Sequence, residues 1–246
     1  MEVVDGNWYM EGLEYNDPRC IRSSGELLEV IERLGFLPLF SNKVPGFSVE
    51  SMTCATSWWT DSDSDPWKWR EELSRSDRVA YGKFFGNKAG YVSRDWFPRF
   101  ANYRRDGYDF DALWSDGLAG YREKLLMDLF VPEDTDMWEV KSFPAIFTND
   151  MKEQAGFGKN GHKNFEGNLA KLQMRSYLIV NDLVQRLNKK GESFGWAVAR
   201  MTPPEARWGY GFVTQAYKET KEESKQAITE HLHQFFPDED FKRLIF

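Results

Sequence analysis

The sequence predicts an α+β protein that is mainly α-helical with small β-hairpins, built from tandem winged-helix-like units. Residues 168–190 have helical periodicity, with apolar side chains on one broad face and basic side chains opposite them. A Lys-Lys-Gly stop follows, and residues 194–201 then have the character of a strand. A helix with a basic stripe followed by a hairpin is typical of winged-helix modules. An amphipathic helix with a solvated charged face, beside an unrelated hairpin, explains the same pattern.

Both halves of the chain have the order helix, helix, hairpin, although the letters show no internal repeat. This order predicts two units joined by an acidic linker that follows Pro132. The predicted segments are an irregular N-terminal segment (1–20), a first winged-helix-like unit with a long connecting helix (21–131), the acidic linker (132–149), a second winged-helix-like unit (150–217) and C-terminal helices (218–246).

The first predicted helix covers residues 25–34 and has a clear signal at each end. Ser23 or Ser24 caps its N-terminus, and Gly35 ends it. The apolar run that follows contains Pro38, which excludes it from the centre of a sheet. Beyond that run, a stretch around a Pro-Gly turn has the composition of a loop, up to Ser57.

Asp61, Asp63 and Asp65 alternate like the first ligands of a calcium-binding loop. Pro66, however, stands where such a loop needs a glycine for its sharp turn. We therefore interpret Asp65 as the N-cap and Pro66 as the first residue of a helix that runs through Ser74.

The remaining elements follow from periodicity and turn residues. They are a hairpin of residues 79–85 and 89–92, a helix over 94–105 capped by Ser93, a long helix over 110–130, a short helix over 150–156, a hairpin of 194–201 and 209–214, and a helix over 218–236. Residues 156–163 are rich in glycine and basic, so they are either a loop that contacts a phosphate or a plain turn. They lack the Gly-Lys-Ser/Thr ending of a Walker motif.

The net charge of −7 argues against indiscriminate binding to nucleic acid, but the charge is unevenly distributed. Residues 78–105 carry +6 and residues 142–190 carry +4, whereas residues 1–77 carry −8 and residues 106–141 carry −7. The two positive blocks either face a phosphate backbone or pair with the acidic blocks of the same chain.

The two cysteines, Cys20 and Cys54, have no metal-binding spacing and form no disulfide framework. The sequence contains no apolar run long enough to span a bilayer and no signal-peptide pattern at its N-terminus. We therefore expect a cytoplasmic protein with reduced cysteines, no cofactor, no metal and no contact with membranes.

The segment from Lys83 to Pro98 reads KFFGNKAGYVSRDWFP and is followed by Tyr103-Arg104-Arg105. This segment resembles the winged-helix DNA glycosylases of the AlkZ/YcaQ type, and the chain is similar to the AlkZ-related branch over residues 19–215. The sequence from Leu34 to Leu37 also resembles the end of the helix before that family's active-site strand. The resemblance implies tandem winged helices around a DNA-binding cleft, with excision of damaged bases as the ancestral chemistry.

The chain departs from that family at the active-site strand. Where the glycosylases carry Gln-aliphatic-Gln or Gln-aliphatic-Asp to position the attacking water, Pro38 and Phe40 occupy the two polar positions. Neither side chain can act as a general base. Gln173 is a candidate for a relocated catalytic residue, although a buried glutamine bonded to backbone is the commoner situation.

Three hypotheses follow: a DNA-binding protein without the hydrolytic step, an active glycosylase or nucleobase hydrolase with a relocated residue, and a non-catalytic scaffold for protein or small-molecule binding. For DNA contact, exposed aromatic residues such as Trp58 and Trp59 could stack on bases, although core packing explains them equally. The candidate phosphate-binding residues are Lys83, Lys88, Arg94, Arg104, Arg105, Lys159, Lys163, Lys171, Arg175, Arg186 and Lys189.

Overall fold

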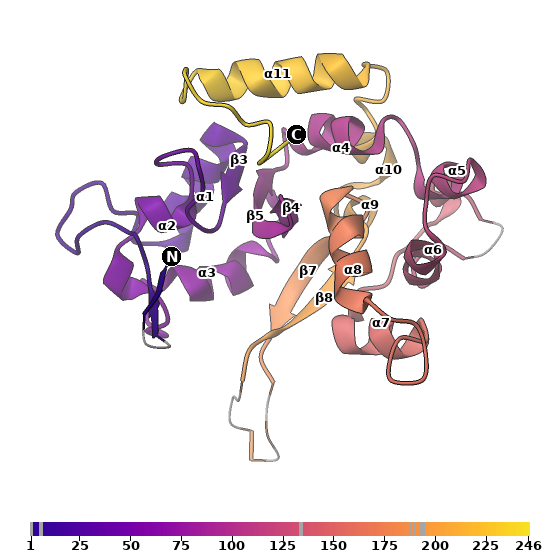
Figure 1. The fold of residues 1–246 in the computed structure, drawn as a ribbon, viewed down its shortest axis with the longest axis horizontal. Coiled ribbons are helices and arrows are strands. Elements are labelled where there is room, and N and C mark those ends of the chain that lie inside the picture. The colour runs from indigo at the N-terminus through magenta and orange to yellow at the C-terminus, as the bar shows by residue number, and fades with distance from the viewer. Residues whose placement is uncertain (1, 5–6, 133–134, 187, 189, 192–194) are drawn as a thin grey trace. The chain divides into compact units, whose positions relative to one another are not determined.

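The computed structural model describes residues 2–4, 7–132, 135–186, 188, 190–191 and 195–246. The chain forms two compact units, unit 1 with residues 1–97 and 227–246, and unit 2 with residues 98–226 (Figure 1). Each unit combines helices with three neighbouring antiparallel strands, which confirms the predicted α+β class.

In unit 1 the strand β5 lies between β3 and β4, so β3 is an edge strand. The elements of unit 1 are β1 (Glu2–Val4), β2 (Asn7–Tyr9), α1 (Ser24–Leu34), β3 (Phe36–Pro38), α2 (Val49–Met52), the 3-10 helix η1 (Ala55–Ser57), α3 (Pro66–Leu73), β4 (Val79–Phe85) and β5 (Lys88–Ser93). Pro38 pairs with Gly90 of β5, in line with the exclusion of this proline from a central strand. The segment predicted as a loop after β3 contains α2, which begins with a capping box of Ser48 and Ser51.

Three local predictions in unit 1 are confirmed. The Ser23 hydroxyl accepts a hydrogen bond from the backbone of Glu26, and α1 ends at Gly35, which has a φ of 77°. The Asp65 carboxylate caps α3, whose first residue is Pro66. The β4–β5 hairpin turns at Gly86 and Asn87, which have φ values of 55° and 67°; two successive left-handed residues form the turn that suits a two-residue hairpin.

Unit 2 has the corresponding strand arrangement, with β8 between β6 and β7. The elements of unit 2 are α4 (Phe97–Arg105), α5 (Phe110–Ser115), α6 (Tyr121–Met127), η2 (Met137–Glu139), β6 (Ile146–Phe147), α7 (Thr148–Gln154), α8 (Phe165–Met174), β7 (Ile179–Val184), β8 (Val198–Thr202), α9 (Pro204–Trp208), α10 (Tyr210–Val213) and α11 (Lys221–His233). The boundaries between the two units fall within α4 and α11, so each of these two helices belongs partly to unit 1. The short helix predicted near residue 150 and the C-terminal helix are present as α7 and α11.

The long helix predicted over residues 168–190 is wrong, because α8 ends at Met174 and the second half of that segment is β7. Ser176 has a φ of 60°, which breaks the helix. The β-branched residues Ile179, Val180 and Val184 favour a strand. A short apolar segment fits a helical wheel and a buried strand equally well. Asp182 of this strand forms a bidentate ion pair with Arg200 of β8.

Three other boundaries differ from the prediction. The helix predicted over 110–130 is divided into α5 and α6, and Gly117, with a φ of 71°, lies between them. Residues 209–214 contain α10 rather than a strand, since Pro204 begins the helical segment and β8 pairs instead with β6 and β7. Ser93 does not cap a helix; it ends β5 opposite Val79, and α4 begins only at Phe97.

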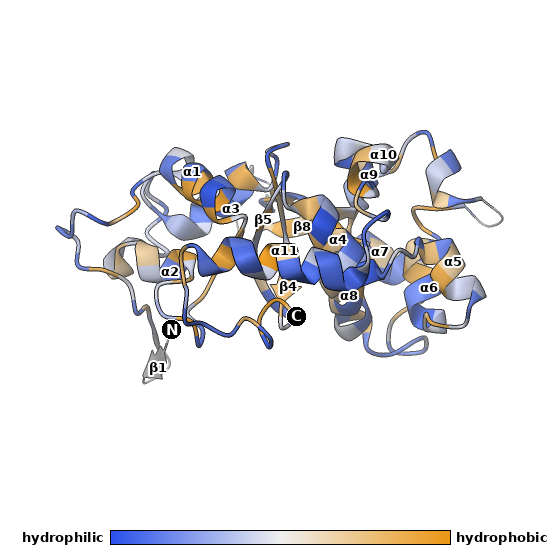
Figure 2. Cartoon of the chain, turned by 90° about the horizontal axis from the view of Figure 1, so that it is seen from above, coloured by the Kyte–Doolittle hydropathy of each residue, from blue (hydrophilic) through white to orange (hydrophobic). Residues whose placement is uncertain are grey.

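The C-terminal helix α11 is amphipathic, with orange apolar positions among blue polar ones in Figure 2. Its apolar residues Ile228 and Leu232 are completely buried. No helix in the described part of the chain is long and apolar enough to cross a membrane.

Candidate functional site

Both basic residues predicted on α8 form ion pairs within unit 2. Lys171 Nζ lies 2.5 Å from Glu123 Oε1, and Arg175 Nη1 lies 3.3 Å from Glu123 Oε2. Glu123 is only 2% exposed, while the Lys171 side chain is 47% exposed. The two cations are four residues apart and project from one side of the helix towards the same carboxylate. The alternative that basic and acidic blocks pair inside the chain therefore holds for these two residues.

Arg105, at the end of α4, is completely buried in unit 2. Its guanidinium donates to Glu205 Oε1 at 2.5 Å and to the carbonyl oxygen of Ser176 at 2.8 Å. Burial alone would lower the pKa of Arg105, but the Glu205 carboxylate raises it well above its usual range. Burial lowers the pKa of the neighbouring Arg104 to about 10. The Arg105 guanidinium is thus buried and ion-paired in the core of unit 2, where it cannot contact a phosphate.

Tyrosines and a carboxylate surround the Arg105–Glu205 pair. The hydroxyls of Tyr177 and Tyr217 donate to the carbonyl oxygen of Tyr108 at 2.9 and 3.2 Å. Burial raises the pKa of Tyr217 to about 12. Asp109 accepts a hydrogen bond of 2.6 Å from the Tyr210 hydroxyl, and burial raises the pKa of the Asp109 carboxyl despite this bond.

Two oxygens of this buried network have no hydrogen-bond partner within the described chain, Glu205 Oε2 and Asp109 Oδ1. The network joins segments that are about one hundred residues apart in the sequence, as in the contact of Tyr210 with Asp109. Only Arg105 of this network was singled out in the sequence, as a phosphate-binding candidate, and no motif marks its partners. We assign the network to the stability of unit 2.

The other predicted phosphate-binding residues lie mainly in hairpins and loops. Lys88 is exposed directly after the β4–β5 turn, and the partly buried Lys83 lies on β4. Arg186 is exposed after β7, and Lys189 lies outside the described residues. Arg94, also exposed, follows β5.

The glycine-rich loop between α7 and α8 is a closed turn that contains Lys159 and Lys163. The Lys163 ammonium donates to the carbonyl oxygens of Gly158 and Lys159 at 3.0 and 2.7 Å. A Cβ on Gly161 would lie 2.0 Å from the Gly156 carbonyl oxygen, so the turn requires glycine at that position. The loop follows a helix rather than a strand, unlike a phosphate-binding loop of the Walker type.

The end of β3 is surrounded by aromatic rings rather than by polar side chains. The ring of Phe40 lies 5.9 Å from that of Trp58 and 6.4 Å from that of Trp67, measured between centroids. The nearby Glu50 is completely buried, and its two oxygens accept hydrogen bonds from the backbone of Glu11 and Ser41. Although burial raises the pKa of Glu50, hydrogen bonds to its carboxylate lower it overall. The Glu50 carboxylate therefore holds the backbone at Glu11 and Ser41 in place and is not available to act as a base.

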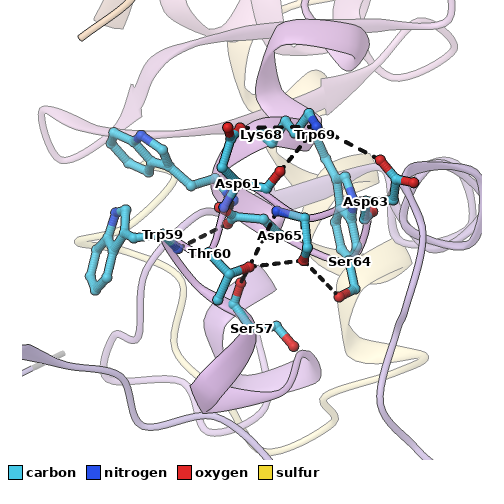
Figure 3. Close-up of polar contacts among 11 residues, drawn as sticks. Ser57, Trp59, Thr60, Asp61, Asp63, Ser64, Asp65, Lys68 and Trp69 are labelled. Atoms are coloured by element: carbon cyan, nitrogen blue, oxygen red, sulfur yellow. Dashed lines mark hydrogen bonds and ion pairs between the residues drawn. The ribbon is translucent and has the colours of Figure 1, made fainter. Parts of the chain in front are cut away.

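The Asp-rich loop before α3 is organised by Asp65 (Figure 3). The Asp65 carboxylate accepts hydrogen bonds from the backbone nitrogens of Trp59, Asp61 and Trp67 at 3.1, 3.0 and 2.8 Å. The side chains of Asp61 and Asp63 point to solvent. A calcium loop would need all three carboxylates directed at one point. No cluster of three or more potential metal ligands occurs anywhere in the described part of the chain.

A family model described as AlkZ related matches residues 21–245 of the chain. The chain belongs to the AlkZ-related family. No curated protein and no solved structure matches it.

In this AlkZ-related protein the remaining predicted residues are mostly enclosed. Gln173 is 4% exposed, and its side-chain nitrogen donates to the carbonyl oxygen of Leu169 in its own helix at 3.4 Å. Trp58 is 5% exposed and donates to the Thr53 hydroxyl at 3.0 Å. Trp59 is half-buried and has a left-handed backbone with a φ of 60°. The burial of Trp58 and Gln173 indicates that these two side chains pack inside the protein and do not contact a base.

Proposed function

We propose that this AlkZ-related protein binds DNA through tandem winged-helix units and lacks the Gln-based hydrolytic step of the glycosylases it resembles. The observation that carries the proposal is the repeated order of elements. Unit 1 runs α1, β3, α2, α3, β4, β5, and unit 2 runs α6, β6, α7, α8, β7, β8. In both units the last strand lies between the first strand and its hairpin partner. Helix, strand, two helices and a hairpin in this pairing support the winged-helix assignment.

The positions of the charges favour the two hairpins as the parts that contact phosphates. In unit 1, Asp61 and Asp63 precede α3 with fully exposed side chains, so this helix is a poor candidate for the DNA-facing one. In unit 2, Glu123 already binds both cations of α8. By contrast, Lys88 and Arg186 are exposed in the β4–β5 and β7–β8 hairpins. Contacts of this kind would position DNA without reading its sequence.

Replacing both hairpin cations is expected to weaken duplex binding. In a titration of a fluorescent DNA duplex, Lys88→Glu/Arg186→Glu should bind about tenfold less tightly or worse. The slope of log K against log salt should also decrease by about 2, since each lost phosphate contact contributes about 0.9. Lys43→Glu/Lys218→Glu is the matched control, because both lysines are exposed and the net charge changes equally. Equal binding by the two double variants would contradict the assignment to the hairpins.

Variants of Lys171 and Arg175 are unsuitable for this purpose. Glutamate at both positions would place three carboxylates together, with the buried Glu123 among them. Loss of binding would then report unfolding rather than a lost phosphate contact.

The proposed lack of hydrolysis predicts that the protein releases no base from lesion-bearing duplex DNA under conditions in which it binds that duplex. The physical reason is that Pro38 and Phe40 supply no group that can activate water. Chromatographic detection of free base checks this. Release that Gln173→Ala abolishes would instead support the relocated active site, and release that persists in this variant would exclude Gln173 while still contradicting the proposal.

A further inference from the structure

We propose that unit 2 carries a second nucleic-acid contact, a stacking surface for unpaired nucleotides centred on Tyr121. This surface consists of Leu118, which precedes α6, Tyr121, the first residue of α6, and the loop residues Lys159 and Lys163. The inference rests on the proposed function, because it assigns a class of nucleic acid to one face of a DNA-binding protein. Figure 1 shows α6 and the loop that joins α7 to α8.

The Tyr121 ring is exposed but held in place. Tyr121 is 59% exposed, and Leu118, three residues earlier, is 51% exposed. The ring of His162 meets the Tyr121 ring edge to face, with centroids 5.8 Å apart. His162 is supported in turn by Phe157, whose ring is 5.7 Å away and which is itself buried. Such a supported ring is a preformed platform whose stacking costs little conformational entropy.

The loop that contacts this ring carries cations. The loop that carries His162 also carries Lys159 and Lys163, both exposed. Two of the three ammonium donors of Lys163 are used by loop carbonyls, which fixes its charge at the surface. Arg175 donates to the carbonyl oxygen of Leu118 at 3.4 Å, which brings the end of α8 to the same place.

The segment that carries these cations has a net positive charge. From residue 157 to residue 175 the chain carries four cations and one acid, Glu166. Glu123 is buried and neutralised by two of those cations. The two exposed lysines of the loop, Lys159 and Lys163, and the exposed Tyr121 ring that the same loop contacts through His162 are together complementary to a strand whose phosphates and bases are both accessible.

An unpaired strand fits this arrangement better than a duplex. Bases inside a duplex stack on one another, so a surface ring cannot reach their faces. A flexible strand can place a base on Tyr121 while its phosphates contact the lysines. Gly156 and Gly158 remove side chains from the loop, which lets a backbone approach closely.

The test is a titration of a fluorescent single-stranded oligonucleotide with the full chain. Tyr121→Ala should bind about tenfold less tightly, which corresponds to the loss of one base–aromatic stack. Tyr121→Trp should retain binding, because it keeps a π-face. Tyr15→Ala is the matched control, since Tyr15 is 61% exposed on unit 1. Lys159→Glu should lower the salt slope by about 0.7, the contribution of one phosphate contact in a single strand.

Parallel duplex titrations separate this inference from the proposed function. We expect Tyr121→Ala to leave duplex binding within twofold of the wild type. If duplex binds but single-strand affinity does not depend on Tyr121, the stacking surface is wrong and the proposed function stands. If the wild-type protein binds neither form at low salt, both are wrong.

Discussion

Replacing Arg105 by leucine is expected to lower the free energy of unfolding by about 3–5 kcal/mol, enough to prevent folding of a marginally stable domain. The guanidinium and the Glu205 carboxylate are both completely buried, with their nearest atoms 2.5 Å apart. Without Arg105 the carboxylate would remain in the core with no counter-charge, and the Ser176 carbonyl would lose its donor. Chemical denaturation followed by circular dichroism measures the loss.

The control is the double variant Arg105→Leu/Glu205→Leu, which removes both charges together. Because replacing a buried ion pair by apolar residues of similar volume is often close to neutral, the double variant should be more stable than Arg105→Leu alone. Additive losses in the two single variants, with no recovery in the double variant, would show that the pair is not energetically coupled.

The second large effect is expected for Asp65→Ala, which should lower the free energy of unfolding by about 3 kcal/mol. The substitution removes an N-cap, worth about 1 kcal/mol, and leaves two further backbone N–H groups without their acceptor at about 1 kcal/mol or more each. Two of the donors, Trp59 and Asp61, have left-handed backbones with φ of 60° and 58°, so the carboxylate also maintains a strained loop. The same denaturation measurement applies.

Asp61→Ala is the matched control for this loop. The Asp61 side chain is fully exposed, and it contributes only a distant pair with Lys68 at 3.9 Å. Because Asp61 has a left-handed backbone, which aspartate tolerates better than alanine, we expect a loss of at most about 1 kcal/mol, well below that of Asp65→Ala. Similar losses for Asp65→Ala and Asp61→Ala would contradict the conclusion that the Asp65 carboxylate stabilises the loop shown in Figure 3.

Elements with local signals could be predicted from the sequence. Ser23 and Gly35 define α1, Asp65 and Pro66 define the start of α3, and Gly86-Asn87 defines the β4–β5 turn. Each of these signals acts on backbone within a few residues, so it needs no knowledge of the partner elements.

The segment after α8 could not be predicted in this way. The apolar residues from Leu169 to Val184 satisfy a helical wheel, yet those from Ile179 onward form β7. The choice depends on pairing with β8, as in Ile179 with Thr202, and that pairing is non-local.

The candidate site could be predicted only in part from the sequence, for a similar reason. Basic side chains can be identified from the sequence, but their partners cannot. Lys171 and Glu123 are 48 residues apart, and Arg105 and Glu205 are 100 apart. These long-range pairs separate the cations that stabilise the fold from those, such as Lys88 and Arg186, that remain candidates for DNA.

The most direct test of the central proposal is the affinity of the wild-type protein for a DNA duplex from about 50 to about 200 mM salt. Binding through a few exposed hairpin cations predicts a linear decrease of log K with log salt and a slope of a few units, shallower than that of a protein with six to ten phosphate contacts. No binding at the lowest salt, or binding that does not change with salt, would contradict the proposal that this AlkZ-related protein holds DNA by its phosphates.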